Sequence, residues 1–455
     1  ELTREKFLDF HSKYYHPSNS YIYLYGNVDF AKELEFIDEE YLSHYEKKVV
    51  DSEVALQKPF LTPETLKDTY SVSEEEEEGV YLSYNVAAGD SCDNERGLAM
   101  QILDYVLFTM PGAPVRKKLI DAGLGKDVDS YYDGGIQQPL FSIIVKNAGK
   151  GKEDLFIQTV EEALKEQVEK GLNKKAIYSA INNYEFKYRE ADFGRFPKGL
   201  IYGLNFLNSW LYDDDEPFLY LKILDVFAAL KEKIETGYFE ELIQKYLLDN
   251  SHKSYVSIEP EKGLNARLEK ELEEKLAAYK KDLSEEEIDK LVEDTKHLKQ
   301  YQEEPSPKED LMKIPMLKRQ DMKREAQPLV YEKVSCNGIE TIHTNIYSNG
   351  IHYLNLMFDI SDITEEELPY LGVLKAVLGY MDTEHYNYAD LANEINLMTG
   401  GISSQINIYA DTKKKDSFHA KYEVRSKILY QNLEEGLRLL SEILMGTQIT
   451  DEKRL

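Results

Sequence analysis

Residues 6–29 read KFLDFHSKYYHPSNSYIYLYGNVD, and this stretch decides how the rest of the chain is interpreted. Aromatic residues at helical spacing predict a helix over Thr3–Tyr15. The run His16–Asn19 breaks that helix and turns the chain, and Tyr21–Tyr25 is expected to form a short strand. A bare helix and strand cannot bury their own faces, so this stretch is expected to be the tail of a domain.

The same pattern occurs a second time further along the chain. The matching parts are Phe7 with Phe239, Lys13-Tyr14 with Lys245-Tyr246, and Ser20-Tyr21 with Ser254-Tyr255. A second echo pairs Glu161-Glu162-Ala163-Leu164 and Gly171 with Glu434-Glu435-Gly436-Leu437 and Gly446, in helices that follow strands beginning at Phe141 and Phe418. Chance similarity of such short matches is the alternative. Because the order of the elements agrees as well, a duplicated module is predicted.

The repeats divide the chain into five predicted parts. A strand with clean alternation at Val80–Val86 begins the sheet of the complete copy. Ser284 and Glu287 form a capping box inside a helical hairpin. The parts are the tail of a first domain at 1–50, a linker at 51–68, a complete second domain at 69–263, a helical hairpin linker at 264–326, and the N-terminal part of a third domain at 327–455.

Three segments carry a resemblance to a known family. They are residues 7–20 with Gly26-Asn27-Val28-Asp29, residues 283–298 with Ile314-Pro315-Met316-Leu317, and Tyr353–Ser361 with Met381-Asp382-Thr383 and Gly400-Gly401-Ile402-Ser403. In these segments the chain resembles the pitrilysin/insulinase superfamily of zinc metallopeptidases. The hairpin is the most branch-specific part, and it resembles the presequence protease branch.

The resemblance implies an α+β fold. Pitrilysin-type domains, each an antiparallel-rich sheet with helices on one face, would be repeated and joined by a long helical hairpin. Four such domains would close as a clam-shell around a chamber that holds short unfolded peptides. In this family two histidines of a His-x-x-Glu-His helix and a distal glutamate bind zinc, and the motif glutamate acts as general base on the bound water. That site belongs to the first domain, so zinc is expected upstream of residue 1.

None of the nine histidines satisfies that zinc motif. The nearest match is Met381–His385, where methionine stands at the place of the first ligand, and His385 is interpreted as a surface or loop residue. Alignment with the family's zinc helix places Val373, Ala376 and Val377 at the ligand positions, and these side chains cannot bind zinc. No catalytic residue, metal ligand or substrate-binding residue is therefore assigned, and no cofactor is expected in this part of the polypeptide.

Composition narrows the class of partner. The chain has 55 basic and 84 acidic residues, a net charge of −29. Such a field repels nucleic acid and anionic membranes and attracts cationic ligands, so unfolded peptides, basic ones among them, are the expected partners. Solvated helices such as Glu269–Lys281 hold much of this charge, which also serves solubility.

Compartment is indicated only indirectly. Two cysteines, Cys92 and Cys336, are too few for a disulfide framework or a cysteine zinc site. No run approaches the roughly 18 apolar residues of a membrane span. The chain starts at Glu1 and no targeting segment is visible, so a bacterial cytoplasm is expected, with an organelle matrix as the alternative.

The sequence thus predicts the non-catalytic central portion of a zinc-dependent metalloendopeptidase that degrades short unstructured peptides. This portion would form chamber wall and hinge, and it would need the body of the first domain and a C-terminal half from the same polypeptide. One alternative is a stand-alone inactive peptide-binding or scaffold subunit of the same superfamily. Another is a helical-repeat interaction protein, against which the alternating strands at Val80–Val86 and Phe141–Val145 argue.

Overall fold

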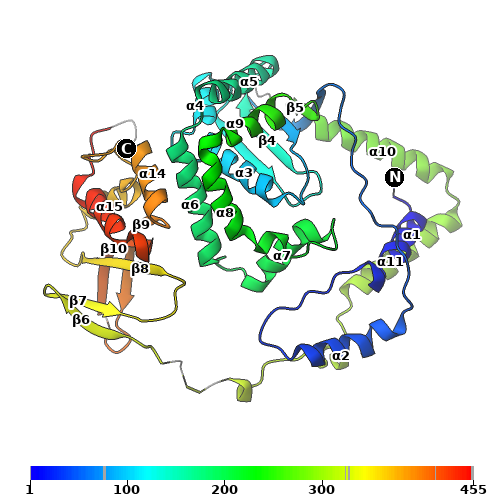
Figure 1. Ribbon diagram of the computed structural model, residues 1–455. Helices are drawn as coiled ribbons and strands as arrows, with labels where there is room; N and C mark the ends of the chain where they lie inside the picture. The colour runs from blue at the N-terminus through cyan, green and yellow to red at the C-terminus, as the bar shows by residue number, and fades with distance from the viewer. Residues whose placement is uncertain (1, 75–77, 323, 326–327, 416, 452–455) are drawn as a thin grey trace. The chain divides into compact units, whose positions relative to one another are not determined.

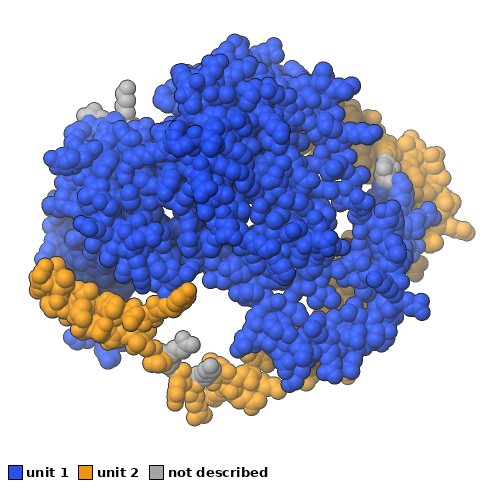
Figure 2. All heavy atoms as spheres, viewed as in Figure 1, with its two compact units in different colours: residues 1–68, 77–259, 348–455 blue, residues 69–76, 260–347 orange. Residues whose placement is uncertain are grey.

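The computed structural model describes residues 2–74, 78–322, 324–325, 328–415 and 417–451. These residues form two compact units (Figure 2): residues 1–68, 77–259 and 348–455 make the first, and residues 69–76 and 260–347 make the second. Within the first unit we distinguish a middle module, residues 80–258, and a C-terminal module, residues 351–446. The fold is α+β, with antiparallel sheets, as predicted.

A five-stranded sheet underlies the middle module, in the order β1-β5-β2-β4-β3. The strands are β1 (Glu64–Val72), β2 (Val80–Ala87), β3 (Asp127–Asp133), β4 (Leu140–Ala148) and β5 (Lys253–Lys262). The central strand β2 pairs antiparallel with β4 on one side and with β5 on the other. Its alternate residues from Val80 to Val86 are buried, which confirms the strand predicted there.

Helices cover one face of this sheet (Figure 1). They are α3 (Asn94–Asp104), α4 (Pro114–Asp121), α5 (Glu153–Lys170), α6 (Lys174–Glu190), α7 (Lys198–Trp210), α8 (Ile223–Lys233) and α9 (Tyr238–Leu242), with π-helical turns η3 (Tyr105–Thr109) and η6 (Ile243–Leu248). The stretch Asn94–Asp121 is long and apolar enough to cross a membrane, but 61% of its most apolar window is buried inside the module. Those apolar side chains are core side chains.

The C-terminal module repeats the order of the middle module's first half. It contains β8 (Ile351–Asp359), α13 (Leu368–Val377), α14 (Tyr388–Met398), β9 (Ile402–Ala410), β10 (Phe418–Leu429) and α15 (Leu433–Gly446). Its three strands lie in the order β8-β10-β9, which matches β2-β4-β3. The module has its own small apolar clusters, separate from the core of the middle module.

The N-terminal segment has no core of its own. Its helices, α1 (Arg4–Tyr14) and α2 (Phe30–Glu40), bury none of their residues. The strand predicted at Tyr21–Tyr25 is wrong, because these residues are extended but belong to none of the described sheets. Their tyrosines instead lie along α7, with ring centroids 4.6 Å apart for Tyr21 and Trp210 and 5.2 Å apart for Tyr23 and Phe206.

The second unit contains the predicted helical hairpin, α10 (Leu264–Asp282) and α11 (Glu285–Glu303). The capping box between Ser284 and Glu287 is present, with both reciprocal hydrogen bonds. None of the residues of these two helices is buried. After α12 (Lys308–Leu311), the strands β6 (Glu332–Cys336) and β7 (Ile339–His343) form a two-stranded hairpin.

Candidate functional site

The positions aligned with zinc ligands lie on or beside α13. Val377 is buried at 7% exposure, whereas Val373 is 49% exposed. His385 lies in the loop after this helix, where its Nδ1 is 2.9 Å from Glu442 Oε2 and its backbone N–H donates to Glu442 Oε1. These contacts with the carboxylate raise the pKa of His385. Among the described residues, no three or more His, Cys, Asp or Glu side chains form a group that could hold a metal ion.

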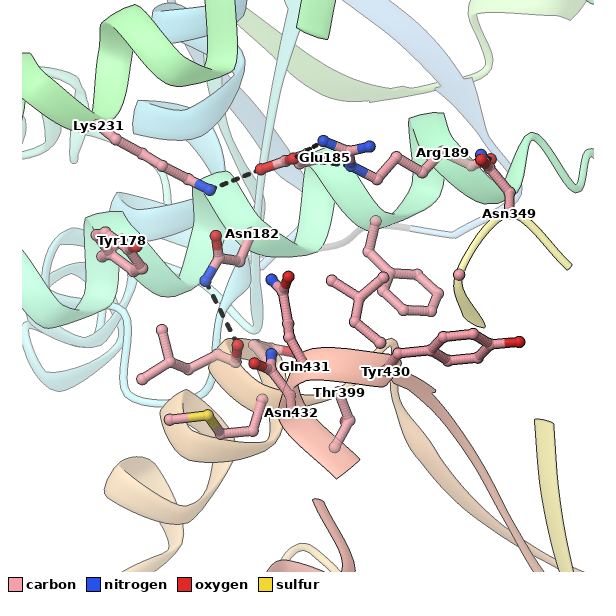
Figure 3. Close-up of a pocket in the computed structure, with 16 residues that line it drawn as sticks. Tyr178, Asn182, Glu185, Arg189, Lys231, Asn349, Thr399, Tyr430, Gln431 and Asn432 are labelled. Carbon is pink, nitrogen blue, oxygen red and sulfur yellow. Dashed lines mark hydrogen bonds and ion pairs between the residues drawn. The ribbon is translucent and has the colours of Figure 1, made fainter. Parts of the chain in front are cut away.

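The structure instead places a polar cleft of about 510 Å³ between α6 and the C-terminal module (Figure 3). One wall comes from successive turns of α6 and from Lys231 of α8. The other wall comes from the ends of α14, β10 and the turn before β8. The lining residues are Tyr178, Asn182, Glu185, Phe186, Arg189, Lys231, Asn349, Gly350, Asn396, Leu397, Met398, Thr399, Leu429, Tyr430, Gln431 and Asn432.

The charged side chains of the cleft form one ion-pair network on the helical wall. Glu185 accepts hydrogen bonds from Lys231 Nζ at 2.6 Å and from Arg189 Nε at 2.8 Å. Burial alone would raise the pKa of Glu185, but the two cations outweigh that effect and hold the pKa below its usual value. Two cations against one carboxylate leave this wall with a positive balance, in contrast to the acidic chain as a whole.

Carboxamides dominate the rest of the cleft. Asn182 Nδ2 donates to the Leu397 carbonyl at 3.4 Å. On the opposite wall, Asn349 Nδ2 donates to the Arg189 carbonyl at 3.0 Å, while Gln431 and Asn432 extend from the turn after β10 (Figure 3). Carboxamides both donate and accept, so such a lining can pair with the polar groups of a peptide backbone. Glu185 is already paired with cations, and no cysteine, histidine or serine is among the lining residues, so the cleft is suited to binding and not to bond cleavage.

Around the cleft, polar contacts join α6 to α14. Ser179 Oγ donates to the Asn393 carbonyl at 3.1 Å, and Asn183 Nδ2 donates to Asn396 Oδ1 at 3.2 Å. Lys175 forms an ion pair with Glu394, which raises the pKa of the lysine. These contacts are largely hydrogen bonds and ion pairs, unlike the apolar interior of either module.

The end of α6 contributes a further set of contacts. Glu190 accepts from Tyr353 OH at 2.9 Å and pairs with Lys427 Nζ at 2.7 Å. Gly400 lies against the Phe186 ring, and a Cβ at that position would overlap the ring. Sequence reasoning assigned none of these residues. The run of polar residues along α6 is their only trace, and it resembles an ordinary solvated helix face.

Two family models match the chain. "Peptidase M16 inactive domain" matches residues 1–184, and the model of the associated domain in subfamily C of the same peptidase family matches residues 258–455. "Protein HypA" of Clostridium perfringens is 41% identical over 456 residues, with 100% of this chain and 47% of the relative covered. "Presequence protease 1, chloroplastic/mitochondrial" of Arabidopsis thaliana is 31% identical over 463 residues, with 100% of this chain and 43% of the relative covered.

Among solved structures, that of an M16-like peptidase from Alicyclobacillus acidocaldarius matches with a TM-score of 0.43 and 19% identity, covering 57% of this chain and 59% of that chain. The chain spans about half the length of the curated relatives it matches.

Proposed function

Because the chain belongs to the presequence protease branch of the M16, or pitrilysin, peptidase family, we propose that it forms the chamber wall, the hinge and the closing contact of a zinc-dependent endopeptidase. It is a non-catalytic part of such a peptidase. In this proposal the zinc ligands and the general base lie in the polypeptide before residue 1, and the substrates are short unstructured peptides.

The polar contact between α6 and the C-terminal module is the observation that carries this proposal. Interfaces that form and separate are more polar than cores, because their groups must be hydrated when apart. Ser179, Lys175 and Glu190 meet that requirement, since each uses a hydroxyl or a charge at the contact. A contact of this kind supports closure of one module against the other, around the amide-lined cleft.

The hinge is assigned to the helical hairpin of residues 264–326. It connects the two modules in sequence, and its two long helices bury none of their residues. Few buried contacts leave a segment at the low-stability end of a fold, where hinges are found. Relatives include bacterial and organellar proteins, and a bacterial cytoplasm stays a prediction for this chain.

The catalytic part of the proposal is tested on the longest natural polypeptide that contains these residues. It should hydrolyse an unstructured peptide of about 20 residues, lose the activity with a chelator and regain it with zinc. The 455 residues alone should not hydrolyse the peptide under any of these conditions. If they alone bind the peptide and the longer polypeptide also fails to cleave it, the stand-alone binding subunit becomes the better description.

The closing contact is tested by charge reversal at Lys175 and Glu394. Lys175→Glu should increase the radius of gyration in solution scattering and lower kcat/KM for the peptide about tenfold, the equivalent of about 1.4 kcal/mol. Adding Glu394→Lys should restore both values, and zinc content should stay unchanged. Lys174→Glu is the matched control, because Lys174 pairs with Glu235 inside the middle module. An unchanged radius in Lys175→Glu would contradict the assignment.

A further inference from the structure

The C-terminal module carries an apolar groove of about 570 Å³ between its sheet and two of its helices. Leu356 and Phe358 line it from β8, Leu374 lines it from α13, and Leu437 lines it from α15. Several of these side chains are open to solvent in this chain: Phe358 is 46% exposed and Leu437 is 45% exposed. A groove with so much uncovered apolar area indicates a surface that is covered in the working protein.

The middle module shows what covers the corresponding place. There β2 corresponds to β8, and α5 corresponds to α15. Phe239 of α9 and Ile243 and Leu247 of η6 are buried at 0% exposure in the module's core, and η6 contacts both α5 and β2. Tyr84 of β2 also donates its hydroxyl to the Leu247 carbonyl at 2.9 Å. An amphipathic helix therefore fills the space between strand and helix.

The backbone makes the same comparison independently of the groove. In the middle module, β2 uses both of its edges, since Tyr81–Val86 pair antiparallel with Lys253–Ile258 of β5 and the opposite edge pairs with β4. Within the described part of the chain, β8 pairs with β10 alone. A nine-residue strand with one open edge presents a row of backbone N–H and C=O groups for another strand.

We propose that this groove and the open edge of β8 together receive one helix followed by one antiparallel strand, supplied by a part of the same polypeptide outside these 455 residues. The helix should carry apolar side chains four residues apart, as Phe239, Ile243 and Leu247 do, and the strand should pair with Tyr353–Phe358. The relatives leave room for such a segment, because the chain covers 47% and 43% of their lengths. The proposal does not depend on the peptidase activity.

Hydrogen exchange with mass spectrometry tests the strand. The 455 residues and the longest natural polypeptide that contains them are compared at peptides covering Ile351–Asp359 and, as reference, Val80–Ala87. In the longer polypeptide the β8 amides should exchange on the order of 100-fold more slowly, while those of β2 should not change. Equal exchange of β8 in both polypeptides overturns the proposal. So does protection in the 455 residues that rises with protein concentration, because the occupant is then a second copy.

Substitutions test the helix. Leu437→Asp and Phe358→Asp should each lower the melting temperature of the 455 residues by at most about 1 °C, because the side chains are already half exposed there. In the longer polypeptide the same changes should lower it by about 4 °C or more, and β8 should lose its protection. Tyr370→Asp is the matched control, since Tyr370 is 76% exposed on α13 and does not line the groove. Equal shifts in both polypeptides contradict the proposal.

Discussion

The middle and C-terminal modules share one order of elements but differ in how well they are covered. In the middle module, the face of β2 that carries Leu82, Tyr84 and Val86 is buried to 2% exposure or less. On β8 of the C-terminal module, Phe358 and Met357 are about half exposed. The difference teaches that strand order and helix order alone do not make a core. A core forms only when a further helix and strand seal the face and edge that the first elements leave open.

The largest expected effect comes from removing one aromatic ring from each module. Phe239→Ala should cost about 3–5 kcal/mol in the middle module, because the ring is fully buried and its loss leaves a cavity. Phe358→Ala should cost less than about 1 kcal/mol in the C-terminal module, because the groove around it is open. Hydrogen exchange during urea titration measures each module separately. Similar costs for the two substitutions would end the comparison.

A smaller effect is expected where the two modules meet. Gly400→Ala should weaken the contact by about 1–3 kcal/mol, because its Cβ overlaps the Phe186 ring and the ring must move. Combining it with Phe186→Ala should cost less than the sum of the two changes. The measurement is the urea midpoint of each module together with the radius of gyration.

Gly372→Ala provides the control for the glycine substitution. Gly372 lies in α13 with nothing within 4 Å of its Cβ position, so alanine there should stabilise the helix by up to about 1 kcal/mol. Destabilisation by Gly372→Ala as large as that by Gly400→Ala would show that the effect is not specific to the contact with Phe186.

The smallest expected effect is a pH dependence confined to the C-terminal module. The pKa of His385 is raised above its ordinary value of 6.5 by Glu442, so the folded state holds this proton more tightly than the unfolded state does. Its contribution is complete below about pH 6.5 and is lost as pH rises through the folded pKa. The melting temperature should therefore fall slightly between about pH 6 and about pH 8.

His385→Asn should remove that slope, and His297→Asn, on the exposed helix α11, should leave it unchanged. A slope that persists in His385→Asn would assign the pH dependence to another group.

Local chemistry was readable from the sequence wherever neighbours along the chain decide the structure. The alternation at Val80–Val86 predicted β2, and Ser284 with Glu287 predicted the start of α11. The segment Tyr21–Tyr25 shows the limit. Alternating apolar residues predict a strand, but a strand also needs a partner edge, and here the tyrosines lie along α7 instead.

The cleft could not be predicted for a related reason. Its walls come from α6, from the turn at Asn349, from the end of α14 and from the turn after β10, which lie far apart in sequence. Glu185 and Arg189 by themselves form an ordinary pair four residues apart on a helix. Only the tertiary arrangement, with Lys231 on one side and the carboxamides on the other, makes them part of a binding surface.

The contact between the N-terminal segment and α7 provides an optical probe. Trp210 is the only tryptophan in the chain, and Tyr21 lies edge-on to it with its hydroxyl 3.2 Å from Asp214 Oδ1. Light absorbed at the red edge of the aromatic band therefore excites one indole, whose emission depends on whether the tail is seated. Stopped-flow fluorescence can follow detachment of the tail in real time, with no label attached to the protein.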